Sequence, residues 1–164
     1  MKDLVDVALK YVGYPAVSAK RNKGNTPDGF SCSGFIEYVL READIAIPKI
    51  PGKNRPISYA VEFFDFFGIP VHYAFRKRGD LVFFSRDGVR PTHLGLCIGR
   101  RKMIHSPGED GEVVSIDEIC RYGGEIEFDH ECGHEQIYKD NPIGIKRPAI
   151  LMPERRFHRT LELR

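Results

Sequence analysis

Residues 92–105 read Thr-His-Leu-Gly-Leu-Cys-Ile-Gly-Arg-Arg-Lys-Met-Ile-His, and this stretch decides the fold class. Its first half alternates strictly, because Leu94, Leu96 and Ile98 occupy one face of an extended strand and the residues between them occupy the other. A Gly-Arg pair then supplies a tight turn, and residues 102–105 follow as a returning strand. The pattern therefore predicts an antiparallel β-hairpin.

The rest of the chain shows helical patterns before this hairpin and strand patterns beside and after it. Apolar residues recur at helical spacing over residues 3–12, from about Ser31 to Ala43, and over residues 57–67. The core positions expected in the first and third helices are Leu4, Val5, Ala8, Leu9, Val12, Ala60, Val61, Phe64 and Phe67. Short apolar runs predict further strands at residues 81–84, 113–114 and 143–150. This order indicates an α+β fold, with N-terminal helices packed on a central antiparallel sheet of about five to six strands.

A length of 164 residues favours one compact domain. Residues 1–150 are expected to form it, with residues 121–141 as a polar insertion and residues 151–164 as a basic C-terminal tail. A net charge of +2 gives no strong attraction to nucleic acid or anionic lipid, and no apolar segment is long enough to cross a membrane. The N-terminus reads without a secretory signal, so the chain as written is expected to be cytoplasmic or to be exported by a signal-independent route.

Cys32 is the first candidate catalytic residue. It lies at the expected start of the second helix, after a loop rich in turn residues. Unpaired backbone N–H groups and the helix dipole at such a position would lower the pKa of the thiol and make it a better nucleophile. The small residues Ser33 and Gly34 would let a substrate approach the sulfur. Taken alone, Cys32 reads equally well as a buried structural cysteine.

His93 and His105 favour the catalytic interpretation. A cysteine hydrolase needs a base from a separate element, and His93 opens the first strand of the hairpin on its less apolar side. In the antiparallel hairpin, His105 on the returning strand can lie beside His93 and hydrogen-bond its far ring nitrogen. Such a bond would fix the tautomer and ring plane of His93, which is the task of the third member of a catalytic triad.

Four segments together resemble the NlpC-type cysteine peptidases of the bacterial cell wall. In chain order they are Gly29-Phe30-Ser31-Cys32-Ser33-Gly34-Phe35, Gly79-Asp80-Leu81-Val82-Phe83-Phe84-Ser85, Thr92-His93-Leu94-Gly95-Leu96-Cys97-Ile98-Gly99 and Met103-Ile104-His105-Ser106. The resemblance implies a papain-like α+β fold and a Cys-His-His catalytic set without metal or organic cofactor. It also implies that amide bonds of peptidoglycan stem peptides are hydrolysed through an acyl-enzyme, typically between D-glutamate and diaminopimelate or lysine. Backbone N–H groups at the helix start, including that of Cys32, would hold the oxyanion.

The sequence departs from this family pattern at two places. The family usually carries Asp immediately before the cysteine, where it helps to bind a free substrate amine, whereas this chain has the uncharged Ser31. The family also tends to carry Pro-Tyr after the first helix, whereas this chain reads Tyr14-Pro15. We therefore take Ser31, Ser33 and Tyr14 as candidate substrate-binding residues, with a peptidoglycan-derived peptide as the expected partner.

Two other functions remain open at this level. The same machinery could act as a cytoplasmic amidase or thioesterase on a substrate other than peptidoglycan. Alternatively, the domain could be an idle binding or assembly module, for instance in a phage tail or a secretion apparatus, although such a module has no need of all three candidate residues.

The remaining polar and cysteine residues receive structural interpretations. Asp80 reads as a turn or strand-start residue, and Cys97 as a small packing residue. The spacing of the residues that could ligate a metal between residues 120 and 134 does not match common zinc sites, so they are expected to lie in a polar loop. These residues are Cys120, His130, Cys132 and His134.

Overall fold

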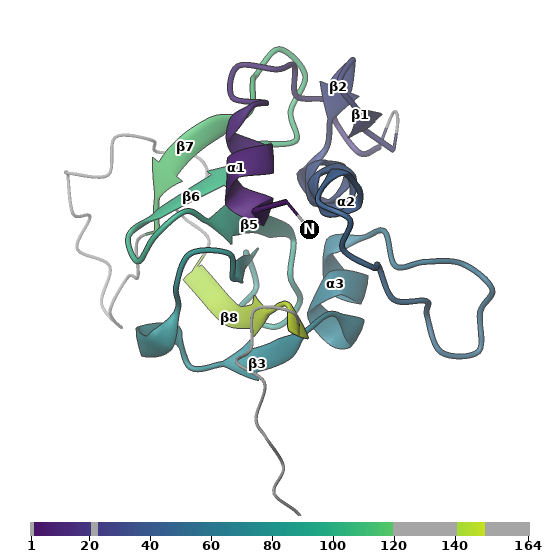
Figure 1. Cartoon of the computed structure of the whole chain (residues 1–164), viewed down its shortest axis with the longest axis vertical. Coiled ribbons are helices and arrows are strands. Elements are labelled where there is room, and N and C mark those ends of the chain that lie inside the picture. The colour runs from purple at the N-terminus through teal and green to yellow at the C-terminus, as the bar shows by residue number, and fades with distance from the viewer. Residues whose placement is uncertain (1, 21–22, 120–140, 150–164) are drawn as a thin grey trace, which may run out of the picture.

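The computed structural model describes residues 2–20, 23–119 and 141–149 (Figure 1). The helices are α1 (Leu4–Leu9), α2 (Cys32–Glu42), α3 (Ala60–Phe66) and the 3₁₀-helix η1 (Tyr73–Phe75). The strands are β1 (Asn25–Thr26), β2 (Gly29–Phe30), β3 (Ile69–Val71), β4 (Leu81–Ser85), β5 (His93–Cys97), β6 (Lys102–His105), β7 (Ser115–Glu118) and β8 (Asn141–Arg147). In the described ranges, no helix has the length and apolar character needed to cross a membrane.

Within the described ranges, six strands form one antiparallel sheet in the order β3-β8-β4-β5-β6-β7, and β1 pairs with β2 in a separate short hairpin. The predicted hairpin is confirmed as β5 and β6, whose register pairs Leu96 with Ile104 and Cys97 with Met103. The α+β class, the N-terminal helices and the six-stranded antiparallel sheet agree with the fold expected from the sequence.

Both faces of the central strands are buried, which fixes the position of the helices. The three helices share one apolar cluster with alternate sheet residues that include Leu81, Leu94 and Ile104. The intervening residues, among them Val82 and Cys97, belong to a second cluster on the opposite face. Each large side chain buried in this way contributes about 1.5–3 kcal/mol, so the β4–β5–β6 unit is a firm support for the residues at its end.

Backbone packing fixes the start of α2 against the loop before β1. Ser31 is the N-cap of α2, and its hydroxyl accepts a hydrogen bond of 3.1 Å from the Gly34 N–H. The Ser31 N–H donates to the Gly24 carbonyl at 2.8 Å. A Cβ atom at Gly34 would lie 1.9 Å from that same Gly24 carbonyl oxygen, so only glycine permits this approach. These contacts hold Cys32, the first residue of α2, in place.

Two helices differ from the sequence prediction. Helix α1 ends at Leu9, and the side chains of Leu9 and Val12 are substantially exposed rather than buried. The helix stops because the chain beyond it pairs elsewhere: the Gly13 N–H donates to the Val114 carbonyl. In α3, which begins at Ala60 rather than at residue 57, Val61 is exposed and Phe63 takes a core position, because the buried stripe passes through Ala60, Phe63 and Phe67.

The strand predictions at the end of the chain also need correction. Residues 113–114 are not a strand of the sheet, because their backbone hydrogen bonds go to the segment after α1, and β7 begins at Ser115. Strand β8 begins at Asn141, inside the range that was expected to be an insertion, and it ends at Arg147. Strand β3 was missed because Pro70 was read as a helix stop, yet β3 is an edge strand, where proline is tolerated.

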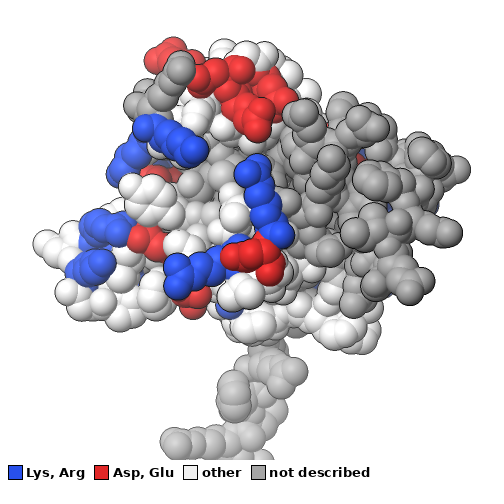
Figure 2. All heavy atoms as spheres, turned by 180° about the vertical axis from the view of Figure 1, so that it is seen from behind, with Lys and Arg blue, Asp and Glu red and all other residues white. Residues whose placement is uncertain are grey.

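The remainder of the expected insertion and the expected C-terminal tail lie outside the described residues. On the face seen from behind, basic and acidic side chains are intermixed, with one acidic group gathered at the upper edge (Figure 2).

Candidate active site

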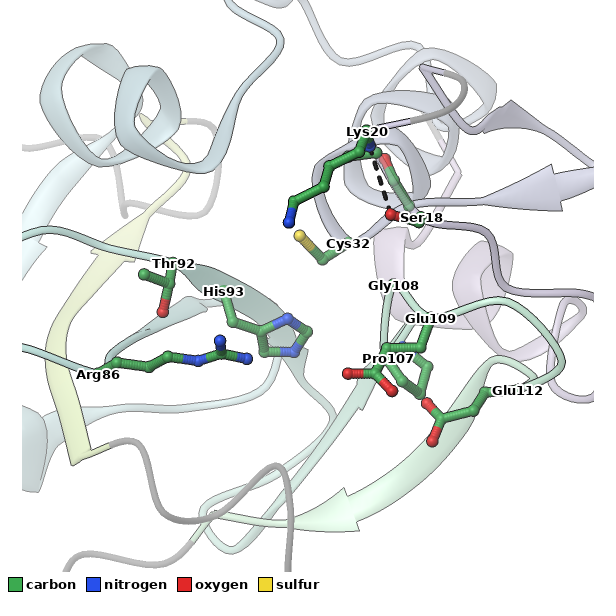
Figure 3. Close-up of a pocket in the computed structure, with 12 residues that line it drawn as sticks. Ser18, Lys20, Cys32, Arg86, Thr92, His93, Pro107, Gly108, Glu109 and Glu112 are labelled. Carbon is green, nitrogen blue, oxygen red and sulfur yellow. Dashed lines mark hydrogen bonds between the residues drawn. The ribbon is translucent and has the colours of Figure 1, made fainter.

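A cavity of about 350 Å³ lies where the start of α2 meets the start of β5 (Figure 3). It contains both Cys32 and His93, which the sequence placed on separate elements. Its lining residues are Ser18, Ala19, Lys20, Ser31, Cys32, Arg86, Thr92, His93, Pro107, Gly108, Glu109 and Glu112. Four segments of the chain therefore build the cavity, and the sheet and α2 hold its two candidate catalytic side chains.

Cys32 is half-buried at the first turn of α2. Burial raises the pKa of its thiol, although backbone N–H groups of Ser33, Leu94 and Cys32 itself pull that pKa down. The expected lowering by the helix start is therefore present but is outweighed by desolvation. The sequence prediction of a thiol with a depressed pKa was wrong for the protein without substrate.

His93 and His105 lie side by side, as the hairpin predicted. His93 Nε2 and His105 Nδ1 are 2.7 Å apart, and the two rings are nearly perpendicular at 81°. Burial lowers the pKa of His93 well below its usual value, and the neighbouring His105 and Arg86 act in the same direction while Asp117 opposes them. His93 is therefore neutral at neutral pH and can accept a proton.

Gly95 explains how the two imidazoles fit on one face. It lies between His93 and Cys97 on β5, next to the β6 residues Met103 and His105. A Cβ atom at Gly95 would lie 2.7 Å from Met103 Sδ and 3.3 Å from His105 Cβ. The glycine of the His-Leu-Gly motif thus leaves room for the side chain of His105.

Asp117 is a residue of the site that the sequence interpretation missed. Its Oδ2 atom lies 2.5 Å from His105 Nε2, and both side chains are buried. The Ser115 hydroxyl donates to the same Oδ2 at 2.8 Å. Both residues belong to β7, whose pattern is inverted: polar Ser115 and Asp117 face inward, and Ile116 is exposed. That inverted alternation was the available signal, but an apolar strand was sought instead at residues 113–114.

The direction of the hydrogen bonds along this chain depends on the tautomer of each histidine. An ionised Asp117 carboxylate can only accept, and with such a partner His105 would donate through Nε2–H and accept at Nδ1. His93 would then donate through Nε2–H and keep its Nδ1 atom as the proton acceptor. This arrangement suits a base whose other nitrogen is held by an orienting group.

The three candidate substrate-binding residues have different surroundings. Ser31 is buried, and its hydroxyl is occupied by the Gly34 N–H and by a 2.8 Å bond to the Lys23 carbonyl. Ser33 lines a second cavity of about 210 Å³ that adjoins the first. Tyr14 lines neither cavity; its ring packs edge-on against Tyr11 with centroids 5.1 Å apart.

Charged residues of both signs line the main cavity. In Figure 3, Lys20 extends toward Cys32 from above and Arg86 extends toward His93 from the left, while Glu109 and Glu112 come from the loop between β6 and β7. Among the described residues, none that lines the second cavity is acidic. It is lined by Ala19, Lys20, Lys23, Ser31, Ser33, Ser58 and Tyr59. This cavity is therefore suited to an anionic group.

The other residues singled out from the sequence have structural surroundings. Asp80 is fully buried and receives two hydrogen bonds from the Arg147 guanidinium, at 2.8 and 2.9 Å. Cys97 is buried in the second apolar cluster, and burial raises the pKa of its thiol to about 12. Among the residues described, no group of three His, Cys, Asp or Glu side chains is arranged to hold a metal ion. Cys120, His130, Cys132 and His134 lie outside the described ranges.

Comparison with known proteins places this geometry in a family. Residues 21–122 match the NlpC/P60 family. A γ-DL-glutamyl hydrolase of Bacillus subtilis is 35% identical over 96 residues, which are 56% of this chain and 21% of that protein. A γ-D-glutamyl-L-lysine dipeptidyl-peptidase of the same species is 27% identical over 121 residues, 71% of this chain and 36% of that protein.

A solved structure agrees with these relatives. The NlpC/p60 domain of the peptidoglycan hydrolase SagA is 30% identical, covers 71% of this chain and 87% of its own, and superposes with a TM-score of 0.55. The chain spans only about a fifth to a third of the length of the two Bacillus relatives. The family match covers more than half of the chain and the fold is the expected one, so the protein belongs to the NlpC/P60 family.

Proposed function

We propose that this protein is a cysteine peptidase that hydrolyses an amide bond of peptidoglycan stem peptides, with Cys32 as nucleophile and His93 as base. The observation that carries the proposal is the cavity that both residues line, together with the 2.7 Å contact between His93 Nε2 and His105 Nδ1. The names of the relatives, which include γ-glutamyl hydrolases and peptidases, support the same chemistry.

The proposed reaction proceeds through an acyl-enzyme. His93 Nδ1 takes the thiol proton as Cys32 Sγ bonds to the amide carbonyl carbon, and the carbonyl electrons move to oxygen. The resulting oxyanion accepts hydrogen bonds from backbone N–H groups at the start of α2, including that of Cys32. The C–N bond then breaks as His93 gives its proton to the leaving amine. His93 then takes a proton from water as the water oxygen bonds to the thioester carbonyl carbon. The C–S bond breaks, and the Cys32 sulfur takes this proton back from His93.

The directions of the Cys32 and His93 pKa shifts indicate when the thiol proton is transferred. The thiol pKa of Cys32 is raised and the imidazole pKa of His93 is lowered, so both groups are neutral before substrate binds. The proton is therefore transferred as Cys32 attacks the carbonyl, and no thiolate–imidazolium pair forms beforehand. This resting state also protects Cys32 from alkylation and oxidation, since the thiolate is the reactive form.

The second cavity indicates which group of the substrate binds beside Cys32. A glutamate that is linked through its γ-carboxyl keeps a free α-carboxylate close to the scissile bond. Lys20 and Lys23 give the cavity beside Cys32 a positive charge, and Ser33 adds a hydroxyl donor. We propose that this cavity receives the α-carboxylate. Ser31 replaces the family's acidic residue and its hydroxyl is already hydrogen-bonded, so recognition of a free substrate amine is not expected to depend on it.

Hydrolysis of defined peptides tests the function. L-Ala-γ-D-Glu-L-Lys and its diaminopimelate counterpart would be incubated with the protein, and the products identified by mass spectrometry. We expect cleavage after D-Glu by the wild type and by Cys97→Ala, and none by Cys32→Ala or His93→Ala. An N-acetylated copy of each peptide should be cleaved as well. Equal product from wild type and Cys32→Ala, or no product from any of these peptides, would contradict the proposal.

A further inference from the structure

Asp117 stands at the closed end of a continuous hydrogen-bonded line that reaches the cavity through two histidines. The line runs from Asp117 Oδ2 to His105 Nε2 at 2.5 Å, and from His105 Nδ1 to His93 Nε2 at 2.7 Å. Its members come from β7, β6 and β5, three neighbouring strands, and they project from the same sheet face. The exposed fractions of the side chains of His105 and Asp117 are 0% and 4%, so water does not screen their interaction.

We propose that Asp117 is a positioning residue that acts through His105 and extends the catalytic set from three members to four. The proposal rests on the function proposed above and adds a residue to it. Asp117 does not touch the substrate. It determines which nitrogen of His105 carries the proton, and His105 in turn determines which nitrogen of His93 is free to accept the proton of Cys32.

The physical reason is that histidine, unlike aspartate, can send its hydrogen bonds in either direction. A neutral imidazole donates from one nitrogen and accepts at the other, so two imidazoles in line could be polarised either way. A terminal carboxylate removes this freedom, because it accepts and cannot donate. In the opposite polarity, His93 would carry its proton on Nδ1 and could not take one from Cys32.

Ser115 reinforces the carboxylate. Its hydroxyl donates to Asp117 Oδ2 at 2.8 Å, so the oxygen that faces His105 receives two donors. Strand β7 lies at the edge of the sheet and is held there by backbone pairing with β6, in which Asp117 is opposite Met103. This pairing does not depend on which side chain residue 117 carries. A substitution of similar shape should therefore keep the strand and change the proton arrangement.

Asp117→Asn is the decisive variant, because an amide has the same shape but its NH₂ group can donate a hydrogen bond to His105 Nε2. That donation would favour the reversed polarity and place a proton on His93 Nδ1. In a catalytic triad, the corresponding Asp-to-Asn change lowers kcat by about 10⁴-fold. We expect a loss of kcat of about 10³–10⁴-fold with KM changed by less than about threefold, and partial recovery of kcat in Asp117→Glu.

Asp80→Asn is the matched control. Asp80 is another buried carboxylate, but it is bonded to Arg147 rather than to the histidines. The control should unfold more easily yet keep the wild-type kcat once the folded fraction is taken into account. If Asp117→Asn likewise keeps kcat within about threefold while Cys32→Ala is inactive, the role of Asp117 is disproved and the proposed function stands. If Cys32→Ala remains active, the proposed function itself fails.

A measurement on the wild-type protein tests the proposal even if Asp117→Asn does not fold. Long-range ¹H–¹⁵N spectra of the histidine rings report which nitrogen carries the proton. We expect His93 and His105 both to be protonated on Nε2 at neutral pH. A proton on Nδ1 of either ring would overturn the proposal, whatever the variants do.

Discussion

Gly95 of β5 lies against His105 of β6, and a Cβ atom at Gly95 would stand 3.3 Å from the Cβ atom of His105 and 2.7 Å from Met103 Sδ. Because Gly95 has no side chain, His105 can remain in line with His93. This close approach links a residue with no functional group to the chemistry of the site.

Gly95→Ala should lower kcat by about tenfold or more with a small effect on KM, because the added methyl group displaces His105 from His93. Overpacking of this kind also destabilises a protein by about 1–3 kcal/mol. Steady-state kinetics and urea unfolding would measure both effects. Gly99→Ala is the control, since a Cβ atom there meets no other atom within 4 Å. An unchanged kcat in Gly95→Ala would show that the position of His105 tolerates the displacement.

Alkylation of Cys32 by iodoacetamide should accelerate as pH rises into the alkaline range. Because burial raises the thiol pKa in the folded protein, the proton stays on sulfur at pH values where an exposed cysteine has already lost it. Peptide mapping at a series of pH values would give the rate at Cys32 alone. The buried Cys97 should react more slowly at every pH. A fast plateau below pH 7 would instead show a preformed thiolate.

Lys20→Gln and Lys23→Gln should each raise KM for a γ-D-glutamyl peptide by about fivefold and leave kcat almost unchanged. One solvated charge pair is worth up to about 1 kcal/mol, and the loss should shrink at high salt. A peptide whose α-carboxylate is amidated should be bound equally by wild type and variants. Lys53→Gln, at an exposed position that lines neither cavity, serves as the control. Equal KM values for all these proteins would contradict binding of the α-carboxylate in the second cavity.

Arg147→Ala should destabilise the fold without changing the chemistry at Cys32. Its guanidinium binds both oxygens of the fully buried Asp80 and joins the end of β8 to the turn before β4. Removing one partner of a buried ion pair typically costs about 3–5 kcal/mol, because the other charge stays buried. Urea unfolding would measure the loss, and kcat of the folded protein should match the wild type. A loss below about 1 kcal/mol would mean that water reaches Asp80 in the variant.

The sequence was sufficient for the hairpin and for the start of α2, since each depends on local pattern. Strict alternation in residues 93–98 was enough to predict β5, and the β5–β6 pairing brought His93 and His105 together as expected. The turn-rich loop and the helical spacing of apolar residues after it were enough to place Cys32 at a helix start. The family resemblance rested on the same segments and is confirmed.

Other features could not be read locally. Val12 and Val61 fit helical stripes, but α1 ends before Val12 and the buried face of α3 is formed by Ala60 and Phe63, so both valine side chains are exposed. The apolar pair at residues 113–114 bonds to the segment after α1, so the polar sequence that follows it forms the edge strand. Tyr14 was predicted to bind substrate because of its position after the first helix, but it lines neither cavity.

By itself, the sequence determined the α+β class, the helix-borne cysteine and the histidine hairpin, because periodicity and capping act over a few neighbouring residues. Only the tertiary structure decided the direction of the Cys32 pKa shift, the inclusion of Asp117 and the positive second cavity. Each of these depends on groups that are distant in the chain: desolvation, charge and hydrogen bonding are set by what surrounds an atom in space. A helix start favours a thiolate, but desolvation of the sulfur outweighs that preference.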